Sequence, residues 1–252
     1  MAQLTILGSS NAIPSLEHEN SHLAVATAER VILVDCASNP VVRLERAGVD
    51  IHAVTDIILT HFHPDHVAGL PLLLMDMWLM GRRPQLNIYG LSYTIDRVES
   101  MMALYGWGEW PDFFTVNFFR IPASELALVL ETTELRVLSS PATHFLPNIG
   151  LRFEFKAGKK SFAYSCDTEP SQAILELARG VDILLHEATG STKGHSSAAQ
   201  AGDVAREAQA GALYLIHYPT GKYASGDPVA EARARFPREV VLAIDFMKID
   251  LG

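Results

Sequence analysis

The sequence predicts one layered α/β domain that spans residues 1–252. Two patterns support this fold class: short apolar or β-branched runs of strand length recur along the chain, and helical patterns lie between several of them. Composition is the third observation, because 48% hydrophobic and 19% charged residues are typical of a globular chain with a sizeable core. Disorder, collagen-like repeats and a disulfide scaffold are therefore excluded.

The individual elements follow from these runs and from capping residues. Ser197 and Gln200 form a capping-box pattern before an alanine-rich helix that is expected to stop at Gly211. Asp227, followed by proline, is the N-cap of a later helix, and residues 168–170 are expected to open another. The expected strands are residues 4–7, 31–34, 56–60, 86–89, 135–138, 151–155, 162–164, 182–185, 213–216 and 240–243.

Charge and cysteine content narrow the possible functions. The formal net charge of −9 argues against a general nucleic-acid-binding surface, because phosphate binding is normally driven by Lys and Arg. Only Cys36 and Cys166 are present, which fits a reducing compartment, so we expect a cytoplasmic protein. No signal peptide is visible, and the most apolar stretch, residues 70–80, is interrupted by Asp76 and too short to span a bilayer. We expect no membrane association.

The strongest functional signal is a group of four candidate metal ligands directly after the apolar strand 56–60. Strand alternation sends His61 and His63 to the same side of the chain. Pro64 then ends the strand, and Asp65 and His66 enter the first turn of a helix. One loop therefore offers two ligand pairs, which suits two metal ions close together. Imidazole and carboxylate groups are common zinc ligands.

Three further candidate ligands, His144, Asp167 and His217, follow other expected strands. Each of them alone could be a solvated loop residue or a hydrogen-bonded core group, and Asp167 could equally cap the next helix. Together with the first four, they complete a plausible set of seven ligands.

Several other short motifs occur in order along the chain, at residues 7–14, 34–36, 164–168, 186–189 (His-Glu-Ala-Thr), 195–197 (His-Ser-Ser) and 243–247. Together with the histidine loop, these motifs are distributed over nearly the whole length of the sequence. In this combination the chain resembles the metallo-β-lactamase superfamily and, within it, the ribonuclease Z-like branch. The resemblance implies a four-layer αββα metallo-β-lactamase sandwich.

The resemblance also implies two divalent metal ions with one bridging carboxylate. The ligands would be His61, His63 and His144 for one ion and Asp65, His66 and His217 for the other, with Asp167 between them. Zinc is the expected metal, although manganese and iron accept the same ligand types.

Such a centre makes the chain a candidate phosphodiesterase, because two ions can share a hydroxide and neutralise a phosphodiester as it gains charge. Asp65 is expected to orient or deprotonate the attacking water, and His195 to protonate the leaving group. Glu187 would orient His195 and stabilise the positively charged form of its ring. The alternative role of Glu187 is a structural hydrogen bond or salt bridge. For His195 the alternative is an exposed residue before a helix cap. Cys166, beside the bridging aspartate, could bind metal as a thiolate or fill buried space.

One departure from the ribonuclease Z pattern concerns the substrate. Only 22 residues separate His144 from Asp167, which leaves no room for the arm that grips transfer RNA. With the acidic charge, this argues against a large RNA and favours a small phosphodiester or another ester. A homodimer is expected by resemblance alone. The alternatives are hydrolysis of a lactone, thioester or sulfate ester, a di-iron oxidoreductase on the same scaffold, and a non-catalytic metal-binding protein.

Overall fold

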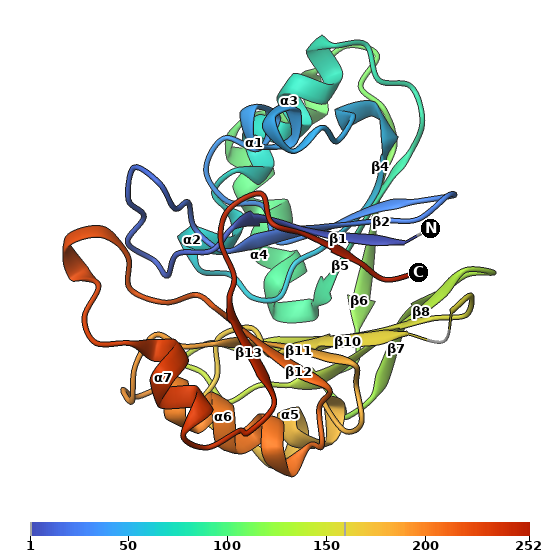
Figure 1. The fold of residues 1–252 in the computed structure, drawn as a ribbon. Coiled ribbons are helices and arrows are strands. Elements are labelled where there is room, and N and C mark those ends of the chain that lie inside the picture. Colours follow the sequence, from blue (N-terminus) through green and yellow to red (C-terminus); the bar gives the residue numbers. More distant parts are fainter. Residues whose placement is uncertain (1, 159) are drawn as a thin grey trace.

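The computed structural model describes residues 2–158 and 160–252. It shows two mixed sheets of seven strands each, packed face to face, with helices on both outer faces (Figure 1). This is the four-layer αββα sandwich that the resemblance implies, and the predicted fold class is confirmed. Among the described residues, no helix combines the length and the apolar character needed to cross a membrane.

The first sheet contains the N-terminal strands and the last strand of the chain, in the order β14-β1-β2-β3-β4-β5-β6. Strands β14, β1, β2 and β3 pair antiparallel, whereas β3 to β6 run parallel. Its strands are β1 (Gln3–Gly8), β2 (His22–Ala26), β3 (Val31–Val34), β4 (Val54–Ile58), β5 (Leu86–Leu91), β6 (Val116–Ile121) and β14 (Lys248–Asp250). The helices in this half are α1 (Pro40–Ala47), α2 (Pro64–Val67), α3 (Leu70–Leu79) and α4 (Ser92–Leu104).

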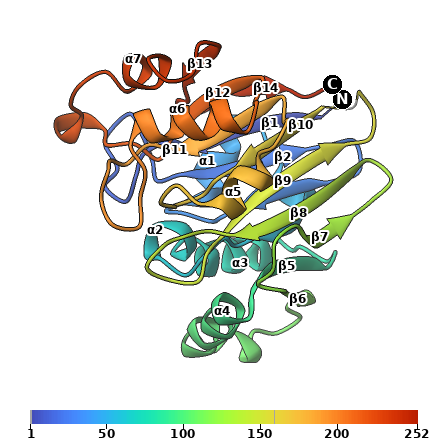
Figure 2. The same cartoon turned by 90° about the horizontal axis from the view of Figure 1, so that it is seen from below.

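The second sheet has the order β13-β12-β11-β10-β9-β8-β7, with parallel pairing from β10 to β13 and antiparallel pairing from β7 to β10. Figure 2 shows α5 and α6 over this sheet, with strands of the first sheet behind. The strands are β7 (Ala127–Glu131), β8 (Leu135–Pro141), β9 (Ile149–Phe155), β10 (Ser161–Tyr164), β11 (Ile183–Glu187), β12 (Ala212–Ile216) and β13 (Glu239–Leu242). The helices are α5 (Gln172–Leu177), α6 (Ala198–Glu207) and α7 (Pro228–Arg233).

One apolar cluster fills the space between the sheets. Ile6 and Ile58 from the first sheet lie in the same cluster as Phe153, Phe162 and Leu185 from the second, and all five are fully buried. The rings of Phe153 and Phe162 stack at a centroid distance of 4.6 Å. Because burial of a large apolar side chain contributes about 1.5–3 kcal/mol, this cluster holds the two sheets together.

The parallel part of each sheet determines where a site can form. In open α/β sheets, ligands bind at the carboxyl ends of the parallel strands. Here the loops after β3 and β4 in one sheet meet the loops after β10, β11 and β12 in the other. The backbone N–H of His217, after β12, donates to the carbonyl of Ser9, after β1, at 2.8 Å, so the two halves are joined directly at this edge.

The capping predictions are confirmed for two helices and wrong in detail for a third. The capping box of Ser197 and Gln200 opens α6, and the Asp227 side chain accepts a hydrogen bond from the third residue of α7. Helix α5 starts later than predicted: Ser171 is its N-cap, because the backbone N–H of Thr168 donates instead to Glu187. Helix α6 ends at Glu207, before the predicted stop at residue 211.

The strand predictions fail in two ways. Strand β4 ends at Ile58 rather than at residue 60, because the backbone N–H of Thr60 leaves the ladder and donates to the side chain of Asp35. Four strands, β2, β6, β7 and β14, were not among the expected ones. Three of these four, β6, β7 and β14, are edge strands.

Candidate metal centre

The histidine loop after β4 is fixed to the neighbouring strand β3 by its backbone. The N–H of Cys36 donates to the carbonyl of His66 at 2.7 Å, and the N–H of Gly69 donates to the carbonyl of Cys36 at 2.8 Å. A Cβ atom at Gly69 would lie 2.6 Å from the carbonyl oxygen of Ala37, so only glycine allows this approach. The loop therefore has little freedom, and the side chains that it carries are held in place.

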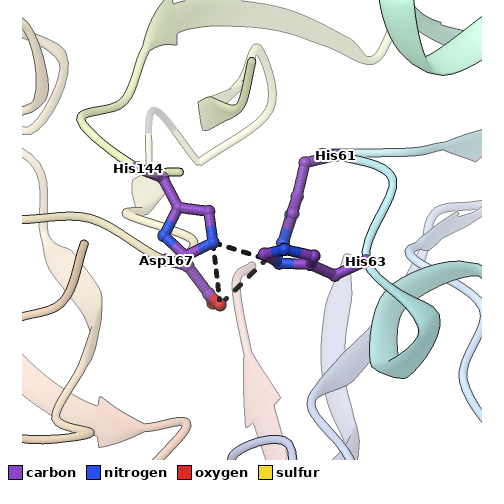
Figure 3. A group of neighbouring side chains, drawn as sticks. All are labelled: His61, His63, His144 and Asp167. Carbon is purple, nitrogen blue, oxygen red and sulfur yellow. Dashed lines mark hydrogen bonds and ion pairs between the residues drawn. The ribbon is translucent and has the colours of Figure 1, made fainter. Parts of the chain in front are cut away.

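Three histidines and Asp167 form the first candidate ligand group (Figure 3). Nε2 of His61 lies 2.9 Å from Nδ1 of His63, and Nε2 of His144 lies 3.1 Å from the same atom. The Oδ2 atom of Asp167 is 3.9 Å from both Nε2 atoms. Donors that share a tetrahedral zinc ion at about 2.0–2.1 Å lie roughly 3.3 Å apart, so these distances suit one ion.

Asp65, His66 and His217 form a second group on the other side of Asp167. Nε2 of His66 and Nε2 of His217 lie 3.5 and 3.6 Å from Oδ2 of Asp65. They lie 3.6 and 3.4 Å from Oδ1 of Asp167. The two oxygens of this one carboxylate therefore face different ligand groups, which is the arrangement that a bridging ligand requires.

Four of the histidines are oriented by a hydrogen bond at Nδ1, which leaves Nε2 directed into the centre. Nδ1 of His66 donates to Asp35 at 2.7 Å, and Nδ1 of His144 donates to the carbonyl of Gly194 at 2.8 Å. The hydroxyls of Thr60 and Thr189 lie 3.1 and 2.8 Å from Nδ1 of His61 and His217. Both hydroxyls donate elsewhere, to Asp35 and to the carbonyl of His217, so they accept from the rings. Such partners fix the tautomer of metal-binding histidines.

Unpaired buried atoms show that the residues fit metal ions. Within the described part of the chain, Nε2 of His66, Nε2 of His217 and Oδ1 of Asp167 are buried without a hydrogen-bond partner. An unsatisfied buried polar group costs about 1–3 kcal/mol, and more if it is charged. All three atoms converge on one point in the second group. A divalent cation there would satisfy them together.

Electrostatics agree with this interpretation. Burial lowers the pKa of His61, His63 and His144, so these rings stay neutral and offer a lone pair. Burial opposes ionisation of Asp167, but the neighbouring His217 and His66 outweigh it and hold the pKa of the carboxyl well below its usual range. In the first group this gives neutral imidazoles around an ionised carboxylate, a donor set that zinc, manganese and iron accept. In the second group burial opposes protonation, but the neighbouring carboxylates, chiefly Asp167, outweigh it and raise the pKa of His66 and His217, so each of these rings holds a proton whose place a divalent cation would take.

Three residues at strand ends adopt a left-handed backbone conformation, which residues other than glycine rarely take. Asp35, Cys166 and His217 have φ values of 63°, 52° and 52°. They follow β3, β10 and β12, and each turn aims a side chain at the centre or at one of its ligands. Backbone strain of this kind is concentrated at functional sites, where surrounding contacts maintain it.

A separate pair, Glu187 and His195, lies beside the ligand groups. Glu187 is fully buried and accepts hydrogen bonds at 2.9 Å from Nδ1 of His195 and from the backbone N–H groups of Thr168 and Thr189. The His195 ring stacks on that of His217, at 5.9 Å between centroids and 14° between planes. A polar atom of His195 lies within 4.8 Å of ligand atoms of Asp167 and His217.

The structure therefore brings all nine sequence-predicted site residues together at one edge of the sandwich: His61, His63, Asp65, His66, His144, Asp167, Glu187, His195 and His217. The alternative role of Asp167 as a helix cap is wrong, because Ser171 caps α5. Cys166 is fully buried with Sγ 3.7 Å from Nδ1 of His61, and burial raises the pKa of its thiol well above the usual range. Its Sγ also lies close enough to His61 and His66 for these three residues to hold a metal ion, so both the space-filling role and the metal-binding role of Cys166 fit its position.

Sequence reasoning missed the residues that orient the ligands, namely Asp35, Thr60, Thr189 and Gly194. One signal was available for Asp35. Asp35 follows strand 31–34, and parallel neighbouring strands end at the same edge of a sheet. This position predicts that Asp35 lies beside the histidine loop. No comparable signal existed for Gly194, whose carbonyl reaches His144 from 50 positions along the chain.

Comparison with known proteins gives the same class. A protein named ribonuclease Z from Methanothermobacter thermautotrophicus is 26% identical, over 100% of this chain and 97% of the relative. The metallo-beta-lactamase fold protein YhfI from Bacillus subtilis has a TM-score of 0.82 at 21% identity, covering 98% of both chains. The short form of human tRNase Z has a TM-score of 0.81 at 23% identity, covering 99% of both chains.

Fold, candidate ligand groups and relatives together place the chain in the metallo-β-lactamase superfamily, in its ribonuclease Z-like branch. The superfamily and branch predicted from the sequence are confirmed. Within that class, the chain belongs to the family described as Anti-Pycsar protein Apyc1, whose model matches residues 2–238.

Proposed function

We propose that this protein hydrolyses small phosphodiesters with two divalent metal ions, zinc being the expected metal. The observation that carries the proposal is the position of Asp167, whose two oxygens face two separate ligand groups. The first ion would be held by His61, His63 and His144 and the second by Asp65, His66 and His217, with Asp167 between them. When bound, such ions lower the pKa of bound water to near neutral pH and neutralise charge on the phosphodiester.

The chain's own residues would move the protons. Asp65 is less buried than Asp167, and its carboxylate lies at the edge of the second ligand group, where it can orient the attacking water and accept a proton from it. As the bond from phosphorus to the leaving oxygen breaks, His195 would donate the proton that this oxygen needs. Glu187 holds His195 through Nδ1, which leaves Nε2 free for this transfer.

The small size of the substrate is supported by the region where ribonuclease Z enzymes carry an arm. Strands β9 and β10 form a closed hairpin here, with the N–H of Phe155 donating to the carbonyl of Lys160 at 2.9 Å. The connection between them, residues 156–160, is only five residues long, which is too short for such an arm. A parallel assay on a 3′-extended transfer-RNA precursor tests this part: cleavage of the precursor would contradict it.

Three further expectations remain proposals. We treat residues 1–252 as one domain, since a single apolar cluster joins both sheets. A cytoplasmic location is supported by two unpaired, buried cysteines, Cys36 and Cys166. A homodimer rests on resemblance, and sedimentation of the purified protein would test it.

The function is tested by loading the purified protein with zinc or manganese and measuring hydrolysis of bis-p-nitrophenyl phosphate. A lactone, a thioester and a sulfate ester are assayed in parallel. We expect turnover of the phosphodiester, loss of turnover in His66→Ala, and full activity in the matched control His52→Ala, whose histidine is exposed and away from the centre. Turnover of another ester but not of the phosphodiester would overturn the proposed bond specificity.

A further inference from the structure

Phe145 is a large apolar side chain that lies exposed beside the metal centre. Its exposed fraction is 55%, and its ring sits edge-on to His144 at 5.2 Å and to His195 at 6.3 Å between centroids. Single exposed apolar residues are common on proteins and need no explanation by themselves. This ring differs because it borders both a candidate ligand and the candidate proton donor.

The ring is held in place by Gly194. A Cβ atom at this glycine would lie 2.8 Å from Cε2 of Phe145 and 3.0 Å from Nδ1 of His144, so the ring rests directly on the glycine backbone. That backbone is fixed at both of its polar groups: the N–H donates to Glu169 and the carbonyl accepts from His144, each at 2.8 Å. Phe145 is therefore preorganised rather than a loose surface side chain.

A positive charge accompanies the ring. The ammonium group of Lys193, the residue before Gly194, lies 5.8 Å from the centroid of the Phe145 ring. This is near the outer limit of a cation–π contact, and Lys193 is exposed, so little holds the ammonium group there. An aromatic surface with an exposed cation beside it suits a ligand that carries both a planar group and a negative charge.

We propose that Phe145 is the stacking surface for a planar aromatic group on the leaving-group side of the phosphodiester. The inference rests on the proposed function, because the leaving oxygen must lie next to His195 to receive its proton. A substituent on that oxygen then extends over the neighbouring Phe145. Phe145 is thus a specificity-determining residue, and diesters with a flat leaving group are preferred over equally apolar, non-planar ones.

Binding of two phosphonates to the metal-loaded protein tests this inference without turnover. In 2-phenylethylphosphonate and 2-cyclohexylethylphosphonate the charge and linker are the same, and the six-carbon ring is planar and aromatic in the first compound and puckered and saturated in the second. Calorimetry gives the ratio of the two dissociation constants. We expect the phenyl compound to bind about three- to tenfold more tightly to the unaltered protein, as aromatic pairs are favoured over area burial alone.

Variants locate the preference. Phe145→Leu should remove it, and Phe145→Tyr should keep it. The control Phe119→Leu should also keep it, because this phenylalanine is 45% exposed on the edge strand β6, stacked on Tyr89. Equal binding of the two phosphonates, binding of neither, or a preference that survives in Phe145→Leu would each overturn the inference.

The two proposals fail in different ways. Loss of the phenyl preference in Phe145→Leu, with no hydrolysis of bis-p-nitrophenyl phosphate, would support the stacking surface and contradict the phosphodiesterase. Hydrolysis with an unchanged ratio in Phe145→Leu would retain the phosphodiesterase and remove the stacking surface.

Discussion

Glu187→Gln separates a residue that positions the proton donor from one that merely supports the fold. The Glu187 carboxylate accepts three N–H groups, from His195, Thr168 and Thr189. A glutamine has one acceptor oxygen, and its amide group would face at least one of these donors. It is also neutral, so it no longer stabilises the positive charge of a protonated His195.

The size of the effect follows from the lost contact. A hydrogen bond to a charged group contributes about 1.5–3 kcal/mol, and about 1.4 kcal/mol corresponds to a factor of ten in rate. We therefore expect kcat for a dialkyl phosphodiester to fall roughly 10- to 100-fold. The fold itself should lose about 1–3 kcal/mol, because one buried N–H is left unpaired.

The assay compares two leaving groups. p-Nitrophenolate leaves without a proton, whereas an alkoxide needs one, so bis-p-nitrophenyl phosphate should be hydrolysed by Glu187→Gln at nearly the normal rate. His195→Ala should show the same selectivity, and the double variant should be little worse than His195→Ala alone. Thermal unfolding confirms that each variant is folded at the assay temperature. Equal losses on both substrates, or fully additive effects in the double variant, would refute the positioning role.

Three other predictions concern the centre and the fold. Asp35→Asn keeps the left-handed backbone, which asparagine tolerates, but weakens the hold on His66, so calorimetry should show metal affinity about 10- to 100-fold lower; unchanged affinity would contradict this. Removing metal with a chelator should lower the melting temperature. The free energy of unfolding should fall by about 2.7 kcal/mol relative to protein with free metal at 100 times its Kd, and no shift in melting temperature on adding metal back would count against the site. Burial lowers the pKa of His22 to about 4 from 6.5, so the unfolded chain binds more protons between these pH values. Stability should therefore fall as pH drops through this window, by about 3 kcal/mol, and urea unfolding of His22→Gln should show a flatter profile; parallel profiles would disprove the assignment.

The strands that were missed show where sequence patterns lose their power. Strands β6 and β14 are at sheet edges, with side chains partly exposed, and they lack the continuous apolar run of a buried parallel strand. Strand β7 is also an edge strand, but residues 126–130 do form such a run, so this strand was missed although its signal is present in the sequence. Strand β2 lies inside the first sheet, but its sequence contains two alanines and one valine. Alanine is depleted in strands, and burial on both faces, not propensity, makes this segment a strand.

Local signals were sufficient wherever the determining interaction lies within a few residues. The capping box of α6, the N-cap of α7 and the placement of His61, His63, Asp65 and His66 after a strand and before a helical turn all follow from neighbouring residues. The wrong prediction for the start of α5 has the opposite cause. The backbone N–H of Thr168 donates to Glu187 on strand β11, and a pattern of neighbouring residues cannot reveal this long-range hydrogen bond.

The sequence by itself determined the class of the protein, the candidate ligands and the short loop that carries four of them, because residue type and spacing are properties of the chain. Only the tertiary structure decided how these side chains are arranged around one another. It places the two oxygens of Asp167 toward different histidine groups, pairs Asp35 with His66, and lays Phe145 on Gly194 beside His195. These relations join residues far apart in the chain, and they exist only because packing of the two sheets brings the carboxyl ends of their parallel strands to one edge.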